Sequence, residues 1–276
     1  LGVVGVRFAD TPPSPSMWRG ETNCGPGMTR AELDEALALG REFLLHNQRH
    51  DGSFAYEWDW QTQTDSNDDN EVRQAGAAWG LGLILQDDPT RTDVRDALLR
   101  SLDFWSTQAR GGVEGDPRRW VLYRSERRGG TGTIALLSLA HIELLRSGAA
   151  LGPDRRQTLE RDLDGFLTML VKQRATGGGF HSFYAADGTP SGKPNPYADG
   201  EALLAMVKAA NYLGRDDLLP LVVAWAKQDR QRNVLDPRAI EPDPDTTKGY
   251  YQWTSMLWWE LLHSKAANEA DWGEWL

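Results

Sequence analysis

The chain has 276 residues, of which 40% are hydrophobic and 25% charged, a balance typical of a folded globular protein that excludes a disordered polar chain. Its formal net charge of -10 argues against nucleic acid or an anionic membrane surface as the main partner, because both bind through basic patches. No apolar run approaches the roughly 18 residues that a transmembrane helix needs, so we expect no membrane span.

Eight helices are predicted in chain order from the spacing of apolar residues and from the turn signals between them. They cover residues 29–48, 70–85, 91–108, 129–148, 152–174, 198–214, 215–231 and 250–265. "RWVLYRSE", residues 119–126, is expected to be a short strand or an extended loop, and the final "ANEADWGEWL" a short ninth helix. Residues 1–28 are rich in Gly and Pro, which predicts an irregular lead-in or linker.

Several helix ends carry recognisable signals. Thr29 followed by Glu32 is a capping box, in which each side chain accepts a hydrogen bond from the other's backbone. Gly148 suits the C-terminal end of one helix, and Pro153 suits the first turn of the next. Pro220 is tolerated only if it lies in a first turn or kinks its helix.

The helices alternate in character along the chain. The first, third, fifth and seventh are charged on one face, whereas the second, fourth, sixth and eighth are rich in Ala, Gly, Ser and Leu and therefore bury two faces. This alternation predicts an all-α fold of helical hairpins arranged in a ring, with the charged helices outside and the small-residue helices inside.

Two stretches of the chain repeat the same pattern. "DGSF" leads through aromatic and acidic residues into the helix at 70–85, and "GGGF" does the same for the helix at 198–214. Phe54 matches Phe180, and Glu71 matches Glu201. A repeat of this kind supports a ring of equivalent units.

The motifs "DGSF", "NEVRQAGAAWGL", "RRGGTGTIALLSLAH", "GGGF", "YADGEALLAMV" and "YYQWTSMLWWEL" together resemble the α/α-toroid superfamily. That superfamily includes (α/α)-barrel glycoside hydrolases, polysaccharide lyases, the helical domain of glucuronyl C5-epimerases and terpene cyclases. The resemblance implies an incomplete or four-hairpin (α/α) toroid over residues 29–265, with short extended loops at one mouth and a C-terminal tail at 266–276. A glycan substrate is the partner that it implies.

In such a ring, the loops that lead into the inner helices meet at one mouth. Glu71 and Glu201 are expected to face each other there, with Asp199 as an alternative to Glu201. Glycoside hydrolysis uses such a pair, one acid to protonate the leaving oxygen and the other as base or nucleophile. A structural role is the alternative for each acid, because Asp and Glu are favoured in the first turn of any helix.

Three basic residues are candidates for the same site. Arg73 could bind a substrate carboxylate through two hydrogen bonds, or pair with an acid such as Glu201. Arg128 precedes "GGTG" and could bind an anionic sugar or phosphate at a helix N-terminus. His181 follows "GGGF" and is either a general acid or base or a loop histidine without a role.

Aromatic side chains gather near the same loops. Trp and Tyr offer flat apolar faces with a polar edge, which suits stacking against sugars. The candidates for such stacking walls are Trp58, Trp60, Tyr184, Tyr197, Tyr251 and Trp253.

No cofactor and no metal are expected. The sequence contains no H-x-x-H, H-E-x-x-H or Cys cluster, and a single cysteine, Cys24, allows no intrachain disulfide. "DSNDDNE", residues 65–71, has oxygen ligands at alternate positions but lacks the Gly and distal Glu of an EF-hand, which favours a solvated acidic loop. The chain begins with Leu, so an extracytoplasmic location as part of a longer precursor stays open.

These features predict a carbohydrate-active enzyme that acts on a polysaccharide or oligosaccharide, acidic ones included, by hydrolysis, elimination or epimerisation. The alternative is a non-catalytic helical module that binds glycan or supports a larger assembly. In that alternative, the acids cap helices and the aromatics form a platform. All three reactions use the same residue types, so the sequence leaves the reaction type and the oligomeric state open.

Overall fold

The structure is a computed structural model that describes residues 29–66, 68–124 and 127–276. The expected lead-in at 1–28, with Cys24, lies outside the described residues. The chain divides into two units, one ending at Phe43 and the other spanning Leu44–Leu276. The boundary therefore falls inside the first helix, α1 (Arg30–His46), and the expected tail at 266–276 belongs to the larger unit.

Helix α1 begins with the capping box that the sequence predicts. The Thr29 N–H donates to Glu32 Oε2 at 2.8 Å, and the Glu32 N–H donates to Thr29 Oγ1 at 3.3 Å. This arrangement satisfies two backbone N–H groups that have no partner within the helix.

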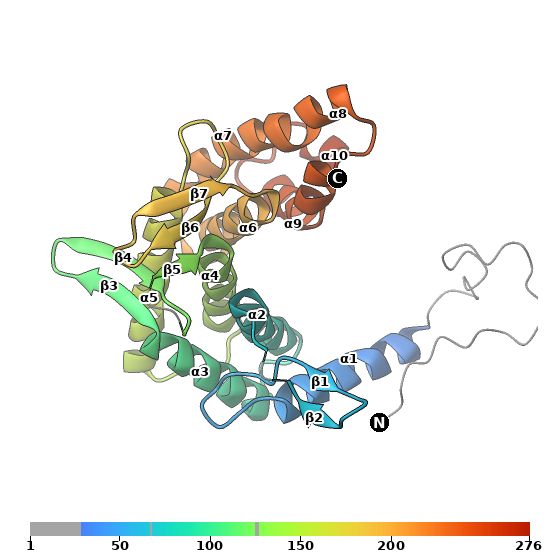
Figure 1. Cartoon of the computed structure of the whole chain (residues 1–276), viewed down its shortest axis with the longest axis vertical. Helices are drawn as coiled ribbons and strands as arrows, with labels where there is room; N and C mark the ends of the chain where they lie inside the picture. Colours follow the sequence, from blue (N-terminus) through green and yellow to red (C-terminus); the bar gives the residue numbers. More distant parts are fainter. Residues whose placement is uncertain (1–28, 67, 125–126) are drawn as a thin grey trace, which may run out of the picture. The chain divides into compact units, whose positions relative to one another are not determined.

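Four helices rich in small and aliphatic residues form the inner row of the larger unit. They are α2 (Glu71–Asp87), α4 (Thr131–Arg146), α6 (Pro196–Leu213) and α9 (Asp245–Leu262). Helix α4 packs between α2 and α6, and α6 packs in turn against α9 (Figure 1). Nearly every residue of α4 and most of α6 are buried, because helices on both sides cover their Ala, Gly and Leu faces.

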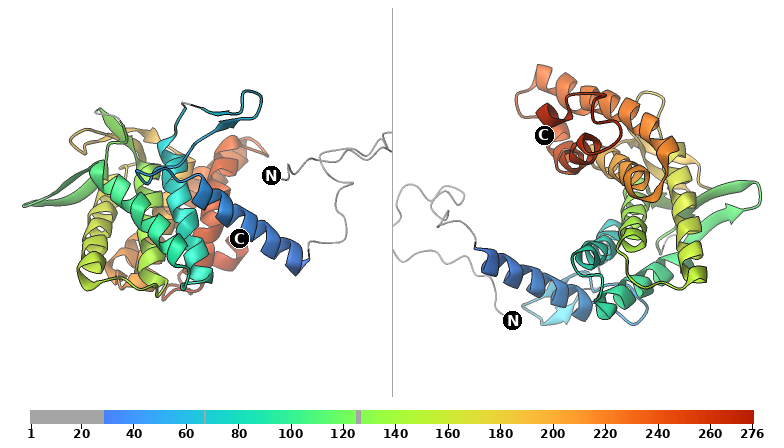
Figure 2. Two further views of the ribbon diagram at one scale, coloured as in Figure 1. Left: turned by 90° about the horizontal axis from the view of Figure 1, so that it is seen from below. Right: turned by 180° about the vertical axis from the view of Figure 1, so that it is seen from behind.

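Three amphipathic helices lie outside this inner row. Helix α3 (Thr92–Thr107) packs on α2, α5 (Pro153–Lys172) on α4, and α7 (Leu219–Arg230) on α6 (Figure 2). Each buries one apolar face and leaves charged residues exposed, as the alternating composition predicts. Three helical hairpins, α2–α3, α4–α5 and α6–α7, thus each contribute an inner and an outer helix, and α9 continues the inner row.

Two helix boundaries differ from the sequence prediction. Helix α7 has Pro220 in its first turn, as expected, but continues through a π-helical turn, Gln231–Leu235, into α8 (Asp236–Ile240). Helix α9 begins at Asp245 rather than at residue 250, because "DTTKG", residues 245–249, forms its first turn. Its Gly249 makes room for a ring: a Cβ atom there would lie 2.9 Å from Cε2 of Tyr197.

The fold is mostly α, but three small antiparallel sheets correct the all-α expectation. The strands are β1 (Trp58–Asp59), β2 (Thr64–Asp65), β3 (Ala109–Val113), β4 (Asp116–Val121), β5 (Arg128–Gly130), β6 (His181–Ala185) and β7 (Pro190–Pro194). Strand β5 pairs with β6, so that Gly130 lies opposite Phe183. This pairing joins the segments that lead into α4 and α6, which lie far apart in the sequence.

The C-terminal residues pack against the other helices of the larger unit. A short helix, α10 (Trp272–Trp275), buries Trp272, whose Nε1 donates to the carbonyl of Ala266 at 2.9 Å. The guanidinium of Arg230 stacks 4.4 Å from the centre of the Trp275 ring. Across the described ranges, none of the helices combines the length and apolarity needed to span a membrane.

A buried ionic cluster ties the inner helices together near the end of α4. Lys208 of α6 lies 2.5 Å from Glu143 of α4 and 3.7 Å from Glu260 of α9, measured between Nζ and the nearest carboxyl oxygen. Arg146 Nε lies 2.6 Å from the second oxygen of Glu143. Opposite charges that are buried together compensate much of the cost of removing each from water.

Candidate active site

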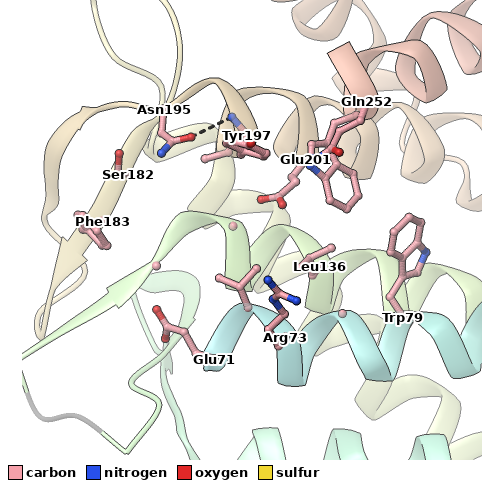
Figure 3. A pocket seen from close by; sticks show the side chains of 16 residues that line it. Glu71, Arg73, Trp79, Leu136, Ser182, Phe183, Asn195, Tyr197, Glu201 and Gln252 are labelled. Atoms are coloured by element: carbon pink, nitrogen blue, oxygen red, sulfur yellow. Dashed lines mark hydrogen bonds between the residues drawn. The ribbon is translucent and has the colours of Figure 1, made fainter. Parts of the chain in front are cut away.

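A cavity of about 680 Å³ opens at the N-terminal ends of the inner helices (Figure 3). Side chains from α2, α4, α6 and α9 line it together with strand β6 and the residue before α6. The lining residues are Glu71, Val72, Arg73, Gly76, Trp79, Gly130, Gly132, Leu136, Ser182, Phe183, Asn195, Tyr197, Ala198, Glu201, Gln252 and Trp253. The two carboxylates matched by the sequence repeat therefore open into one space.

Glu201 projects into this cavity from the second turn of α6. Glu201 is only 4% exposed. Within the described ranges, its carboxyl group forms no hydrogen bond or ion pair. Burial raises the pKa of Glu201 from its ordinary value of 4.5 to about 8, because the charged form loses its hydration. Glu201 is therefore protonated at neutral pH.

Glu71 is the first residue of α2 and is half-buried on the opposite side of the cavity. Burial raises the pKa of its carboxyl group, whereas the Thr133 hydroxyl and the Arg128 guanidinium lower it. Burial raises the pKa of both acids, but the Thr133 hydroxyl and Arg128 oppose this effect at Glu71, whereas no group of the described residues opposes it at Glu201.

Neither glutamate caps its helix. The N-cap of α2 is Asn70, whose side chain accepts the Arg73 N–H at 3.1 Å. The N-cap of α6 is Asn195, whose side chain accepts the Tyr197 N–H at 2.9 Å. Because asparagines fill the capping positions, capping does not explain why acids occupy positions 71 and 201.

Two glycines of "GGTG" make room for the two carboxylates. A Cβ atom added at Gly130 would lie 2.7 Å from Glu71 Oε1, and one added at Gly132 would lie 2.5 Å from Glu201 Oε2. Both distances are shorter than a normal contact, so any larger residue would displace an acid. Gly130 and Gly132 form the floor between the carboxylates, a role that the sequence motif did not reveal.

Arg73 lies on the α2 side of the cavity. Figure 3 shows Glu71, Arg73 and Trp79 projecting from α2, with Glu201 pointing toward them from α6. Arg73 is exposed, and no carboxylate of the described chain forms an ion pair with it, Glu201 included. Its guanidinium is therefore available to a ligand.

Aromatic rings form part of the cavity wall. Tyr197 and Trp253, both expected from the sequence, line it together with Trp79 and Phe183, which were not. The rings of Trp79 and Trp253 approach to 5.6 Å between centroids, although they belong to α2 and α9. Trp79 was missed because its spacing along α2 is that of an ordinary core residue.

The remaining aromatic candidates lie outside the cavity. Trp58 and Trp60 are exposed on the β1–β2 hairpin. Tyr184 is fully buried, and its hydroxyl donates to the Val121 carbonyl at 2.8 Å. The Tyr251 hydroxyl donates to the Leu276 carbonyl at 3.0 Å. The structure brings none of these four side chains to the carboxylates.

Asp199 belongs to a buried network beside the cavity rather than to its lining. Its carboxylate accepts the Phe180 N–H at 2.6 Å, Arg232 Nη1 at 2.7 Å and Asn233 Nδ2 at 2.9 Å. Burial and the nearby Asp229 raise its pKa to about 6. The π-helical turn places Arg232 and Asn233 side by side on this carboxylate, which fixes the turn before β6. The geometry leaves Glu201 as the acid of α6 that a ligand can reach.

His181 and Arg128, two further candidates from the sequence, lie on strands next to the cavity and do not line it. The Nδ1 atom of His181 lies 2.8 Å from the Gly192 carbonyl across the β6–β7 hairpin, and the residue does not line the cavity. Arg128 stacks 4.4 Å from the centre of the Phe183 ring and acts on Glu71 through its charge. Arg128 thus influences the site from its rim.

The acidic loop at 65–71 is partly described, since Asn67 lies outside the described residues. Asp69 accepts hydrogen bonds from the Tyr123 hydroxyl at 2.5 Å and from Gln74 Nε2 at 2.9 Å, and Arg124 pairs with it at 2.9 Å. Among the residues described, no group of three His, Cys, Asp or Glu side chains is arranged to hold a metal ion. Protein donors occupy the oxygens of Asp69.

Comparison of the sequence with protein-family models and with curated protein sequences finds no match.

Proposed function

We propose that the cavity is the active site of a carbohydrate-active enzyme, which acts on a polysaccharide or oligosaccharide by carboxylate acid/base chemistry. One observation carries this proposal: the buried carboxyl group of Glu201, which has no partner among the described residues, faces a cavity that also holds the carboxyl group of Glu71. A buried polar group without a partner is costly to stability, so a functional role is the best reason for its presence.

The surroundings of the two acids support different roles. Glu201, whose pKa burial raises to about 8, keeps its proton at neutral pH and acts as the general acid. Burial raises the pKa of Glu71 as well, but the Thr133 hydroxyl and the Arg128 guanidinium oppose this effect, and in this proposal Glu71 acts as the general base. Unequal environments around two titratable groups are how acid and base roles are divided between them.

The cavity walls favour a saccharide ligand. Trp79, Phe183, Tyr197 and Trp253 offer flat apolar faces, while Asn195 and Gln252 offer amide donors and acceptors. Sugars present both an apolar ring face and a fringe of hydroxyl groups, which such a wall complements. The order of the inner helices, α2, α4, α6 and α9, is consistent with an open four-hairpin (α/α) toroid, which we include in the proposal.

Glu201→Gln tests the proposal directly. The substitution removes the transferable proton but keeps the shape, so we expect turnover of a responsive oligosaccharide to fall by roughly 10²–10⁴-fold with binding nearly unchanged. A panel of neutral and acidic oligosaccharides, followed by product release and by calorimetric binding, supplies the measurement. Glu114→Gln, the same change on the exposed β3–β4 turn, is the matched control and should retain full turnover.

Two results would count against catalysis. Unchanged turnover in Glu201→Gln would remove this residue as the acid. Sugar binding without any turnover in the unaltered protein would indicate a glycan-binding module instead, with affinity lost in Trp253→Ala.

A further inference from the structure

The cavity has an exposed mouth and a less exposed inner end. Its exposed lining residues are Val72, Arg73, Asn195, Tyr197 and Gln252. Four of them belong to the first turns of α2 and α6 or cap α6, so the mouth lies at the N-terminal ends of these helices. Further along the helices the lining consists of Leu136, which is buried, and of Trp79 and Trp253, which are partly buried. A ligand therefore enters at the mouth and advances toward the two tryptophans.

The lining ends at these tryptophans. On α2 it runs from Glu71 to Trp79, and on α9 Trp253 is its last residue. Leu83 of α2 and Met256 of α9 lie further along the same helices and are exposed, but they do not line the cavity. The rings of Trp79 and Trp253 approach to 5.6 Å between centroids. The two side chains thus close the inner end of the cavity from the first and the last helix of the inner row.

Ring contact rather than hydrogen bonding joins the two tryptophans. Both indole Nε1 atoms are buried, and neither has a hydrogen-bond partner among the described residues. Each indole supplies a large, flat apolar face, which is what the contact uses. Because the closure consists of two side chains from two helices, shortening either one should open it.

The closed end lies a short way beyond the two acids. Glu71 and Trp79 are eight residues apart on α2, so about 12 Å of helix separates their backbones. Helical side chains lean toward the N-terminus of their helix, which brings the Trp79 ring nearer to Glu71 than its backbone is. Glu201 points toward this stretch of α2 from α6 (Figure 3). Only a short piece of a ligand therefore fits between the acids and the tryptophans.

A cavity with a closed inner end distinguishes two ways of acting on a polymer. A chain that reacts at an internal sugar continues past the acids on both sides, and it needs a second exit beyond them. A chain end needs only the mouth, because its terminal sugars stop against the inner wall. The contact between Trp79 and Trp253 matches the second case.

We propose that the enzyme acts at the ends of glycan chains, and that Trp79 and Trp253 form the wall that fixes how many terminal sugars pass the acids. The two tryptophans are thus specificity-determining residues. This inference rests on the proposed function and adds the place along the chain at which the reaction occurs.

The position of the altered sugar along the chain tests this inference. The probes are neutral cello-oligosaccharides and acidic oligogalacturonates of defined length, labelled at the reducing end. Chromatography and NMR locate the sugar that is cleaved from its neighbour or epimerised. We expect the unaltered protein to alter a sugar at one fixed distance from a chain end, from the earliest time points onward.

Trp79→Ala removes the wall from the α2 side. The chain end can then slide further past the acids, so we expect the altered position to move inward and to spread over several sugars. Turnover should persist, because the acids remain. Trp79→Phe keeps an aromatic ring and should restore the single position.

Two further variants complete the test. Trp253→Ala opens the same wall from α9 and should give the same spread, so it carries the test if Trp79→Ala does not fold. Trp259→Ala is the matched control, because this α9 tryptophan is 56% exposed and does not line the cavity. It should leave the altered position where the unaltered protein places it.

The outcomes separate this inference from the proposed function. Alteration of internal sugars by the unaltered protein at the earliest time points would overturn the inference and leave a carbohydrate-active enzyme. An unmoved, single position in folded Trp79→Ala and Trp253→Ala would overturn it as well. Folded protein that converts none of the probes would instead remove the proposed function, and this inference with it.

Discussion

Glu201 and Glu143 are both buried on the inner helices, yet their surroundings are opposite. Glu143, with no exposed surface, has Lys208 at 2.5 Å and Arg146 at 2.6 Å. Glu201, seven residues before Lys208 on α6, faces the cavity with no partner among the described residues. The charge of a glutamate is thus compensated at Glu143, near the end of α4. It has no compensating partner at Glu201, near the start of α4.

This difference separates Glu143, an acid with a structural role, from Glu201, the acid that we propose to be catalytic. A paired buried charge holds the helices in register, and its removal leaves the partner uncompensated. An unpaired buried acid stays neutral and lowers stability once the pH exceeds its unfolded pKa. The comparison predicts opposite effects on stability for substitutions at the two places.

The largest expected effect is at Lys208. Lys208→Met removes the cation that contacts both Glu143 and Glu260 and leaves these two buried carboxylates without it. We expect the free energy of unfolding to fall by about 3–5 kcal/mol, the usual cost of breaking a buried ion pair from one side. Urea unfolding of the variant and of the unaltered protein at pH 7 measures this loss of stability.

Lys227→Met, on the exposed face of α7, provides the control and should change stability by less than about 0.5 kcal/mol. Adding Glu143→Gln to Lys208→Met should recover part of the loss, because the pair is then removed from both sides. A loss in Lys208→Met no larger than in the control would contradict the structural role of the cluster.

We expect Glu201→Gln to raise the free energy of unfolding, whereas Lys208→Met lowers it. Between the ordinary pKa of 4.5 and the folded value of about 8, the unfolded chain loses this proton while the folded protein keeps it. The folded state then binds more protons, so its stability falls as the pH rises through this window. Glutamine does not titrate, and we expect the variant to be roughly 3 kcal/mol more stable than the unaltered protein at pH 7.

Urea unfolding of the variant and of the unaltered protein from pH 4 to pH 9 measures this gain. The difference in their free energies of unfolding should be small at pH 4, increase with pH and level off above pH 8. The difference between the proteins isolates Glu201 from the other carboxyl groups. Equal stabilities across the whole range would mean that the carboxyl group of Glu201 ionises normally, and the contrast with Glu143 would then disappear.

The smallest expected effect is at Arg146, the second partner of Glu143. Its side chain is 22% exposed and also stacks 4.1 Å from the centre of the Tyr212 ring. Arg146→Gln leaves Lys208 in place and admits water, so we expect a loss of only about 1 kcal/mol. A loss as large as that of Lys208→Met would show that both cations, rather than the buried one, compensate Glu143.

The sequence predicted most of the helices because apolar spacing and turn residues are local signals. The alternation of small-residue and charged helices also predicted which pack inside, as the burial of α4 and α6 shows. The start of α9 was placed five residues too late, at residue 250 rather than at Asp245. Only its packing beside the Tyr197 ring explains a glycine within the helix.

Part of the cavity lining was also predicted from local patterns in the sequence. The repeat matched Glu71 with Glu201, and both line the cavity. Asp199 carries the same charge two residues earlier, yet it points into the network with Arg232 and Asn233. Two acids that lie two residues apart on a helix face different directions, and sequence spacing alone does not say which direction meets a cavity.

What the sequence determined by itself was the set of helices, their inner or outer character and the matched pair of acids, since these follow from composition and periodicity along the chain. Only the tertiary structure decided that Gly130 and Gly132 separate the acids, that Trp79 meets Trp253, and that Glu201 has no partner among the described residues while Glu143 has two. Burial and pairing depend on side chains brought together from distant segments. The ionisation of an acid, and with it its chemistry, is set by those neighbours.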